Sequence, residues 1–270
     1  MFKRSITGAI LGLTIIIGLL YTFWSAACIF LIILLFSTLE WFVHFTKKQG
    51  VFQSAFFISI QAIIGLLLLN LILVHEVTFP YDLILKLNVI VVFILFLFGC
   101  SLFLKTEYSF YYAWYAGIFY IGLPILVGIA FLYQDYNAHK YIILGLIILN
   151  WSNDTFAYIT GRWIGKTLMA PDISPKKTIE GAFGGLCAAI LAAWIVNEYL
   201  FIHSFPFIKI LFLGIGVWLS GTIGDLYESK MKRLAGIKDS GNLLPGHGGF
   251  LDRFDSFFYI IPVGIFVLLF

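Results

Sequence analysis

The amino-acid sequence predicts an all-α integral membrane protein, and three observations support this prediction. Of the 270 residues, 61% are hydrophobic and only 11% are charged, so the chain has too little polar surface to cover a water-soluble globule. The mean hydropathy is +1.00. Apolar runs of the length that a spanning helix needs, roughly 20 residues, recur along the whole chain. Lipid must therefore serve as part of the solvent of this protein.

The apolar runs are continuous and do not alternate with polar residues. Each strand of a transmembrane β-barrel would show period-two alternation over about 10 residues, so the runs favour helices. They predict about nine transmembrane helices, with boundaries good to a few residues. The predicted spans are 5–22, 25–45, 52–74, 83–104, 110–133, 141–160, 182–201, 207–224 and 255–270.

The basic residues predict a cytoplasmic N-terminus. With this orientation, the cytoplasmic segments hold all but three of the 17 Lys and Arg residues, as the positive-inside rule requires. The exceptions are Lys86, Lys140 and Lys209. Losing one span in the middle would scramble this distribution, so the number of spans and their orientation support each other.

Two cytoplasmic segments, 161–181 and 225–254, differ from all other connections. They are long, contain glycine and are dense in both acidic and basic residues, whereas the predicted outside loops are short. The three cysteines fall inside apolar runs, without the spacing of a metal site or a disulfide. We therefore expect one membrane domain with a polar cavity that opens to the cytoplasmic side between these two segments.

An acidic residue, Asp154, lies in the sixth predicted span, in the stretch WSNDTFAY at 151–158. A carboxylate in an apolar helix is costly, by about 2.5–3.5 kcal/mol on insertion scales, so it normally faces a cavity, a cation or a functional partner. Asp154 is therefore a candidate functional residue. The alternative is a structural contact with Asn153 or with a neighbouring helix.

The stretch SPKKTIEG, just before the seventh span, contains Ser174, Lys176, Lys177 and Thr178. Two lysines between hydroxyl residues suit a polyphosphate, because ammonium groups and hydroxyl donors supply what phosphate oxygens accept. Juxtamembrane lysines are also what the positive-inside rule and anionic lipids call for. On this segment alone the two interpretations stay equally open.

Four acidic residues in the last cytoplasmic segment form two pairs with a spacing of three. Asp225 pairs with Glu228 and Asp252 with Asp255, and on a helix this spacing places both members on one face. Such oxygen-rich groups could hold magnesium, which prefers oxygen ligands and keeps some positions for water and substrate phosphate. The alternative is that Asp252 or Asp255 caps the last helix and pairs with Arg253.

Basic residues and glycines are interleaved with these acids. The bases would neutralise phosphate charge, and the glycine amides around His247 could form a concave anion site. A lone histidine argues against zinc, so His247 is interpreted as a phosphate hydrogen-bond donor or proton-transfer group, with loop structure as the alternative. The interleaved bases are Lys230, Lys232, Arg233, Lys238 and Arg253.

From 229 to 255 the string SKMKRLAGIKDSGNLLPGHGGFLDRFD resembles the signature of the phosphatidate cytidylyltransferases, also called CDP-diacylglycerol synthases. No position of the string differs from that pattern. The preceding GDLYES, SPKKTIEG and NDTFAYITGR are similar to elements of the same family in the same order. The resemblance covers the C-terminal half. It implies that 1–270 is a single domain in which 1–140 are mainly scaffold helices and 141–270 form the catalytic half.

The resemblance implies a reaction of CTP with phosphatidic acid that gives CDP-diacylglycerol and pyrophosphate and requires magnesium. It implies that Asp225, Asp252 and Asp255 hold the metal, with Asp154 completing the cavity. It further implies a monovalent cation such as potassium, a multi-pass protein of the cell membrane with its site facing the cytoplasm, and a possible homodimer. The residues implied for phosphate binding are Lys176, Lys177, Lys230, Lys232, Arg233 and Lys238.

Other classes of protein could use some of these groups. A CTP-dependent lipid kinase would use similar groups but transfer a different phosphorus, while the DGxxAR pattern of CDP-alcohol phosphotransferases is absent. An ion-coupled transporter could place Asp154, Asp225 and Glu40 at membrane depth, but it leaves the concentration of charge around the glycine–histidine turn unexplained. The net charge of +3 is too small to indicate nucleic-acid binding.

Overall fold

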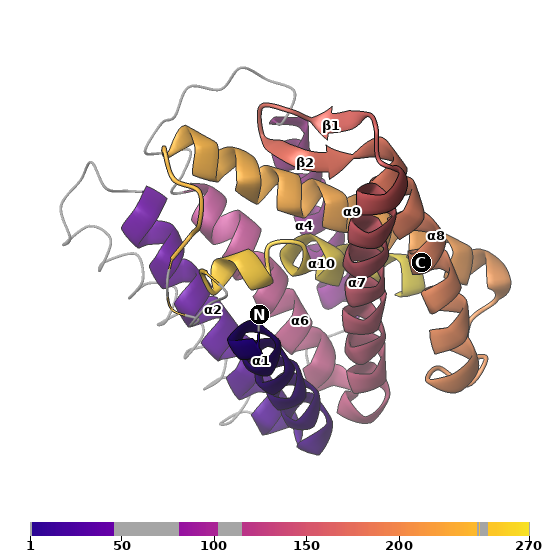
Figure 1. Cartoon of the computed structure of the whole chain (residues 1–270). Helices are drawn as coiled ribbons and strands as arrows, with labels where there is room; N and C mark the ends of the chain where they lie inside the picture. Colours follow the sequence, from indigo (N-terminus) through magenta and orange to yellow (C-terminus); the bar gives the residue numbers. More distant parts are fainter. Residues whose placement is uncertain (1, 46–80, 102–114, 242, 244–247, 270) are drawn as a thin grey trace.

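The computed structural model describes residues 2–45, 81–101, 115–241, 243 and 248–269. Nearly all of its regular structure is helical (Figure 1). Five helices are long and apolar enough to cross a membrane: α2 (Phe23–Phe45), the continuous pair of η2 (Gly117–Gly122) and α6 (Leu123–Gln134), α7 (Tyr136–Ile164), α8 (Ile179–Tyr199) and α9 (Phe207–Leu234). Shorter apolar helices lie within α1 (Phe2–Tyr21), α4 (Tyr81–Cys100) and α10 (Phe257–Leu269).

These helices coincide with eight of the predicted spans, which confirms a helical membrane protein in its coarse form. The predicted span 52–74 lies outside the described residues. The total of nine helices, the cytoplasmic side of the N-terminus and the division into a scaffold half and a catalytic half stay predictions.

Helix α10 lies at the centre of the described bundle (Figure 1) and packs against α4, α6, α7 and α9. Most of its residues are buried, including Phe258, Ile260 and Ile261. The buried Asn88 side chain of α4 donates a 3.0 Å hydrogen bond to the carbonyl of Pro262, which gives its NH2 group a partner inside an apolar core. The central helix therefore holds the segment that precedes it, including Asp255, against the rest of the bundle.

A two-stranded antiparallel sheet joins α7 to α8, a feature that the sequence did not predict. Strand β1 (Leu168–Ala170) pairs with β2 (Ser174–Thr178), with Leu168 opposite Thr178. Thr178 then caps α8, because its side-chain oxygen accepts a hydrogen bond from the amide of Gly181 at 3.1 Å. The hairpin lies at the upper side of the bundle in Figure 1, and β2 packs against α8 and α9.

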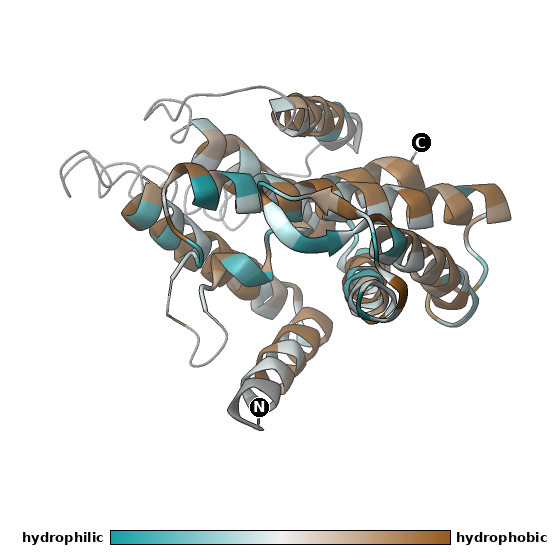
Figure 2. Cartoon of the chain, turned by 45° about the horizontal axis from the view of Figure 1, so that its top comes forward, coloured by the Kyte–Doolittle hydropathy of each residue, from teal (hydrophilic) through white to brown (hydrophobic). Residues whose placement is uncertain are grey.

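Helix α9 continues beyond residue 224, where the predicted span ends, and carries the acidic and basic residues of GDLYESKMKR on its last turns. It ends at a left-handed Gly236 with a φ of 72°, a conformation that favours glycine. Hydrophilic residues concentrate at this end of α9 and along the β1–β2 hairpin, whereas the helices are otherwise mostly hydrophobic (Figure 2).

Candidate functional site

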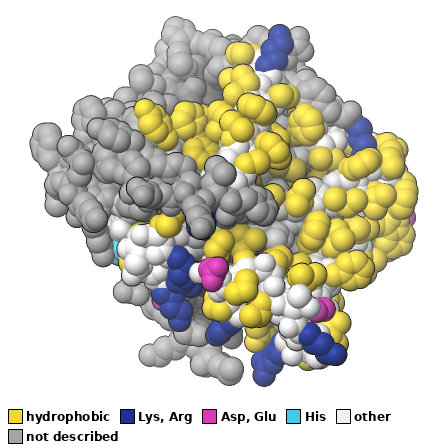
Figure 3. All heavy atoms as spheres, turned by 90° about the horizontal axis from the view of Figure 1, so that it is seen from above, with side chains coloured by type: hydrophobic (Ala, Val, Ile, Leu, Met, Phe, Trp, Pro, Cys, Tyr) yellow, Lys and Arg dark blue, Asp and Glu magenta, His cyan; other side chains and the backbone are white. Residues whose placement is uncertain are grey.

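The polar residues of three separate segments meet at the hairpin end of the bundle. The segments are the C-terminal half of α7 with β2, the last turns of α9, and the stretch from 238 to 256, which includes the 3₁₀ helix η3 (Leu251–Arg253). Seen from the hairpin side, Lys and Arg side chains gather with a few acidic ones in one region, next to a largely hydrophobic surface (Figure 3).

A first cluster forms around Asp225. Its carboxylate lies 2.5 Å from the ammonium nitrogen of Lys177 on β2 and accepts a 3.3 Å hydrogen bond from the Ser229 hydroxyl. Asp154 of α7 interacts electrostatically with both Asp225 and Lys177, and the Asn153 side chain donates to it at 3.2 Å. The tertiary structure therefore brings together two predicted acids and one predicted lysine that are distant in sequence.

A second cluster forms around Lys232, which is only 11% exposed. Its ammonium group pairs with Glu228 one turn earlier in α9 and lies 2.8 Å from Asp252. Asp252 also accepts hydrogen bonds from the amides of Ser240 at 3.2 Å and Gly249 at 3.0 Å. Burial acts to raise the pKa of Asp252, but its contacts with Glu228, Lys232 and Gly249 prevail and lower it to about 2.

Asp255 connects the two clusters. Burial and the negative charge of Asp225 raise the pKa of Asp255 to about 8, against the opposing effects of Lys232, the Ser256 amide and Lys177. The Tyr120 hydroxyl donates a 2.8 Å hydrogen bond to the Asp255 carbonyl. The carboxyl of Asp255 is thus held in a position where the negative charge of Asp225 repels its own negative charge.

This arrangement fits a divalent cation. Two carboxylates that repel each other would be stabilised by a cation between them, and carboxylate oxygens are ligands that magnesium prefers. Within the described part of the chain, no three His, Cys, Asp or Glu side chains form a group that could hold a metal ion. A magnesium ion at Asp225 and Asp255 would therefore complete its coordination with water and substrate phosphates. The predicted third ligand, Asp252, already binds Lys232 and two backbone amides.

The other predicted phosphate-binding residues are distributed more widely. Lys230 donates to the Ser101 carbonyl at 2.5 Å and Arg233 to the Ile237 carbonyl at 3.1 Å. Lys176 and Lys238 are exposed and Ser174 is half-buried. Thr178 is engaged as the cap of α8. His247 lies outside the described residues.

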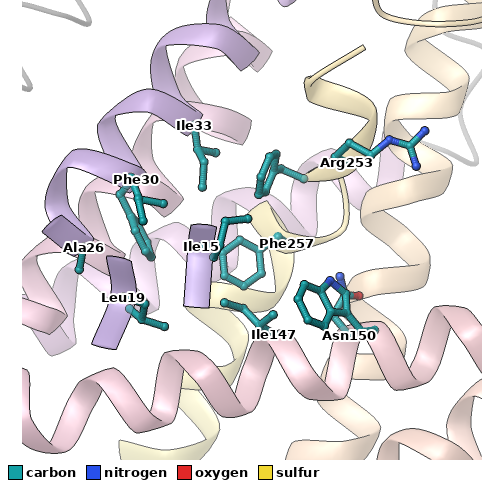
Figure 4. A pocket seen from close by; sticks show the side chains of 12 residues that line it. Ile15, Leu19, Ala26, Phe30, Ile33, Ile147, Asn150, Arg253 and Phe257 are labelled. Atoms are coloured by element: carbon teal, nitrogen blue, oxygen red, sulfur yellow. The ribbon is translucent and has the colours of Figure 1, made fainter. Parts of the chain in front are cut away.

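Arg253 lines an apolar groove beside these clusters. The groove has a volume of about 200 Å³ and runs between α1, the Trp151 side of α7 and Phe254. It adjoins a second apolar pocket, in which Arg253 and Asn150 are the polar members and Phe30 and Phe257 are among the apolar ones (Figure 4). The lining residues of the groove are Thr7, Gly8, Leu11, Gly12, Ile15, Trp151, Arg253 and Phe254.

The structure adds residues that the motifs did not single out as part of a catalytic site. Glu40 of α2 accepts hydrogen bonds from Ser240 and Leu251, and Tyr120 holds the carbonyl of Asp255. In the sequence, Glu40 stands out as the only acidic residue of its predicted span, and from the sequence alone it fits only a carboxylate of a transporter. No comparable signal marks Tyr120 among the many aromatic residues of the chain.

The chain is similar to known proteins over most of its length. The model of the "Cytidylyltransferase family" matches residues 2–270. A phosphatidate cytidylyltransferase of Bacillus subtilis is 35% identical over 215 residues, which cover 78% of this chain and 79% of that protein. Proteins with the same name from Staphylococcus epidermidis and Staphylococcus aureus are each 34% identical, over 77% of this chain and 78% of theirs.

Proposed function

The chain belongs to the cytidylyltransferase family, and we propose that it transfers the cytidylyl group of CTP to phosphatidic acid, giving CDP-diacylglycerol and pyrophosphate for phospholipid synthesis. One observation carries the proposal. Lys177 from β2, Asp225 and Lys232 from α9, and Asp252 and Asp255 from the last segment meet in two linked charge clusters. The lysines of these clusters suit a polyanion, and their acids suit a cation that binds together with it.

The reaction needs positioning and charge stabilisation more than a covalent enzyme intermediate. A phosphomonoester oxygen of phosphatidic acid attacks the α-phosphorus of CTP, a new P–O bond forms, and the bond to pyrophosphate breaks in line. The phosphomonoester is already a competent nucleophile. Two polyanions must approach each other, so their repulsion has to be reduced by the protein.

Asp225 and Asp255 would hold magnesium beside the triphosphate, with Asp252 nearby. When bound, magnesium neutralises phosphate charge and polarises the phosphoryl oxygens. Lys177 already interacts with this acidic pair, so its ammonium group can remain there as a second positive charge next to the triphosphate. The exposed Lys176 adds a third on the same strand. A monovalent cation such as potassium belongs to the proposal on family resemblance alone.

The lipid substrate would enter sideways from the bilayer with its acyl chains still in lipid. The groove between α1 and α7 supports this route, because its walls are mostly apolar and Arg253, the residue after Asp252 in the chain, provides a positive charge in its lining. A phosphate headgroup would lie at Arg253 while a chain follows the apolar wall. The proposal places the site on the cytoplasmic face of the cell membrane, where CTP is available.

The test is product formation by the purified protein in detergent–lipid micelles with CTP, phosphatidic acid and magnesium. We expect pyrophosphate release together with CDP-diacylglycerol, identified by mass, which also separates this reaction from a lipid kinase. An Asp252→Asn variant should lose nearly all activity. The matched control is Asp172→Asn, because Asp172 is an exposed acid in the turn of the hairpin. Absence of product across several lipids and cations would overturn the proposal.

A further inference from the structure

Helix α2 contributes one buried acidic side chain to the charged end of the molecule. Glu40 is 8% exposed and is the only acidic residue of α2. Keeping a carboxyl group in an otherwise apolar helix is costly unless it has a partner or a function. The Lys177–Asp225 and Lys232–Asp252 clusters do not supply a partner for Glu40, because the ion pairs of their lysines are formed with other acids.

The partners of Glu40 are both in the segment that carries Asp252. Its Oε2 atom accepts a 2.8 Å hydrogen bond from the amide of Leu251 and a 3.0 Å hydrogen bond from the hydroxyl of Ser240. A single carboxyl oxygen therefore joins two points of this segment, Ser240 and Leu251, that are not adjacent in the sequence.

Each partner of Glu40 belongs to a residue that is either hydrogen-bonded to Asp252 or adjacent to it in the chain. The amide of Ser240 donates to Asp252 at 3.2 Å, and Leu251 is the residue immediately before Asp252. The amide of Gly249 completes the set at 3.0 Å. Glu40 therefore holds the side chain of the same residue whose amide binds Asp252.

Two glycines pack closely against Glu40 and Ser240. A Cβ atom on Gly249 would lie 1.8 Å from the Ser240 hydroxyl oxygen and 2.7 Å from Glu40, and one on Gly241 would lie 2.4 Å from Glu40. One turn earlier on the same face of α2, Phe36 contacts Phe250, with ring centroids 5.4 Å apart. Helix α2 thus contacts the segment through both a polar and an aromatic side chain.

We propose that Glu40 is a positioning residue for Asp252. It acts through Ser240 and Leu251 and orders the two backbone amides that hold the Asp252 carboxylate toward Lys232. The inference rests on the proposed function for its catalytic consequence, but its structural content does not depend on the reaction. It also means that the N-terminal half of the chain is more than a scaffold.

The test compares Glu40→Leu with Glu40→Gln by hydrogen exchange of peptides that cover 238–254 and by kinetics. Glutamine keeps a carbonyl oxygen that can accept from Ser240 and Leu251, so Glu40→Gln should keep the exchange rate of the native protein and most of its activity. Leucine cannot accept, so the segment should exchange faster, and kcat should fall by up to about 100-fold, the loss that a misplacement of about 1 Å in an active site can cause. The KM for CTP should change little.

Two further variants keep the test decisive. Ser240→Ala removes the same hydrogen bond from the opposite side and should accelerate exchange even if Glu40→Leu fails to fold. Glu198→Leu, which alters a glutamate near the far end of α8 that pairs with His203, should leave exchange at 238–254 unchanged. Unchanged exchange in both Glu40→Leu and Ser240→Ala would overturn the inference, as would a Glu40→Gln variant as defective as Glu40→Leu. If the native protein makes no product, the exchange result still decides the role of Glu40.

Discussion

The ammonium nitrogen of Lys177 lies 2.5 Å from a carboxylate oxygen of Asp225, and this contact joins the β1–β2 hairpin to the last turns of α9. The two side chains are 27% and 33% exposed, so the pair is open to a substrate while still partly shielded from solvent. Its position beside Asp255 makes it the point where a triphosphate would meet both positive and negative groups of the protein.

Replacing Lys177 by alanine should reduce kcat/KM for CTP by about 100-fold or more, the effect typical of removing one group that stabilises transition-state charge. The reason is that the variant lacks the ammonium group that interacts with Asp225 and Asp255 and that would also interact with the phosphates. Steady-state kinetics at saturating phosphatidic acid measure this. Lys86→Ala, on an exposed lysine of α4, is the control, and equal activity in both variants would contradict a substrate role for Lys177.

Replacing Lys232 by methionine should destabilise the protein by about 3–5 kcal/mol, the range found when one partner of a buried ion pair is removed. Methionine would leave Glu228 and Asp252 without their cation. The apparent midpoint of thermal unfolding in detergent measures the loss. The exposed Lys238, changed to methionine in the same way, should leave that midpoint nearly unchanged. A similar midpoint for both variants would show that Lys232 is dispensable for the fold.

In the absence of divalent cations, the stability of the protein should fall as the pH rises from about 4 to about 8. The pKa of Asp255 is raised from 3.8 to about 8 in the folded protein. In this range the folded state keeps a proton that the unfolded chain has lost, so rising pH favours unfolding. Thermal unfolding with a chelator from pH 5 to 8.5 measures the trend, and added magnesium should reduce it.

The Asp255→Asn variant should lack this part of the pH dependence. Asp252→Asn serves as the contrast, because the lowered pKa of Asp252, about 2, stabilises the fold above about pH 4 and its contribution is lost only as the pH falls toward 2. An Asp255→Asn variant with the same slope as the native protein between pH 5 and 8 would refute the assignment of the proton to Asp255.

Filling the groove between α1 and α7 should weaken the binding of the lipid substrate and leave the binding of the nucleotide unchanged. Gly12 faces Trp151 across this groove, and a Cβ atom added there would already lie 3.2 Å from the indole ring. We expect Gly12→Phe to raise the KM for long-chain phosphatidic acid severalfold, with an unchanged KM for CTP. Ile17→Phe, on a 63% exposed position of α1, is the control. An unchanged lipid KM in Gly12→Phe would exclude this groove as the route of the acyl chain.

Much of the fold follows from the sequence because the physical demands of lipid are local. Each span must satisfy its own backbone hydrogen bonds and must be apolar over enough residues to cross the bilayer, so α2, α7, α8 and α9 can be located by composition alone. The extension of α9 past 224 and the short sheet could not be located in this way. Polar residues are compatible with helix, strand or loop, and only contacts with β2 and the last segment decide between them.

The sequence by itself determined the chemical groups of the site: the acids, the lysines and the glycines of three motifs, together with the family to which they belong. Only the tertiary structure decided which groups meet. It paired Lys177 with Asp225 and Lys232 with Asp252, and it brought Glu40 from α2 against Ser240 and Leu251. Charge interactions and hydrogen bonds depend on distance in space, and distance along the chain carries almost no information about them once helices fold against one another.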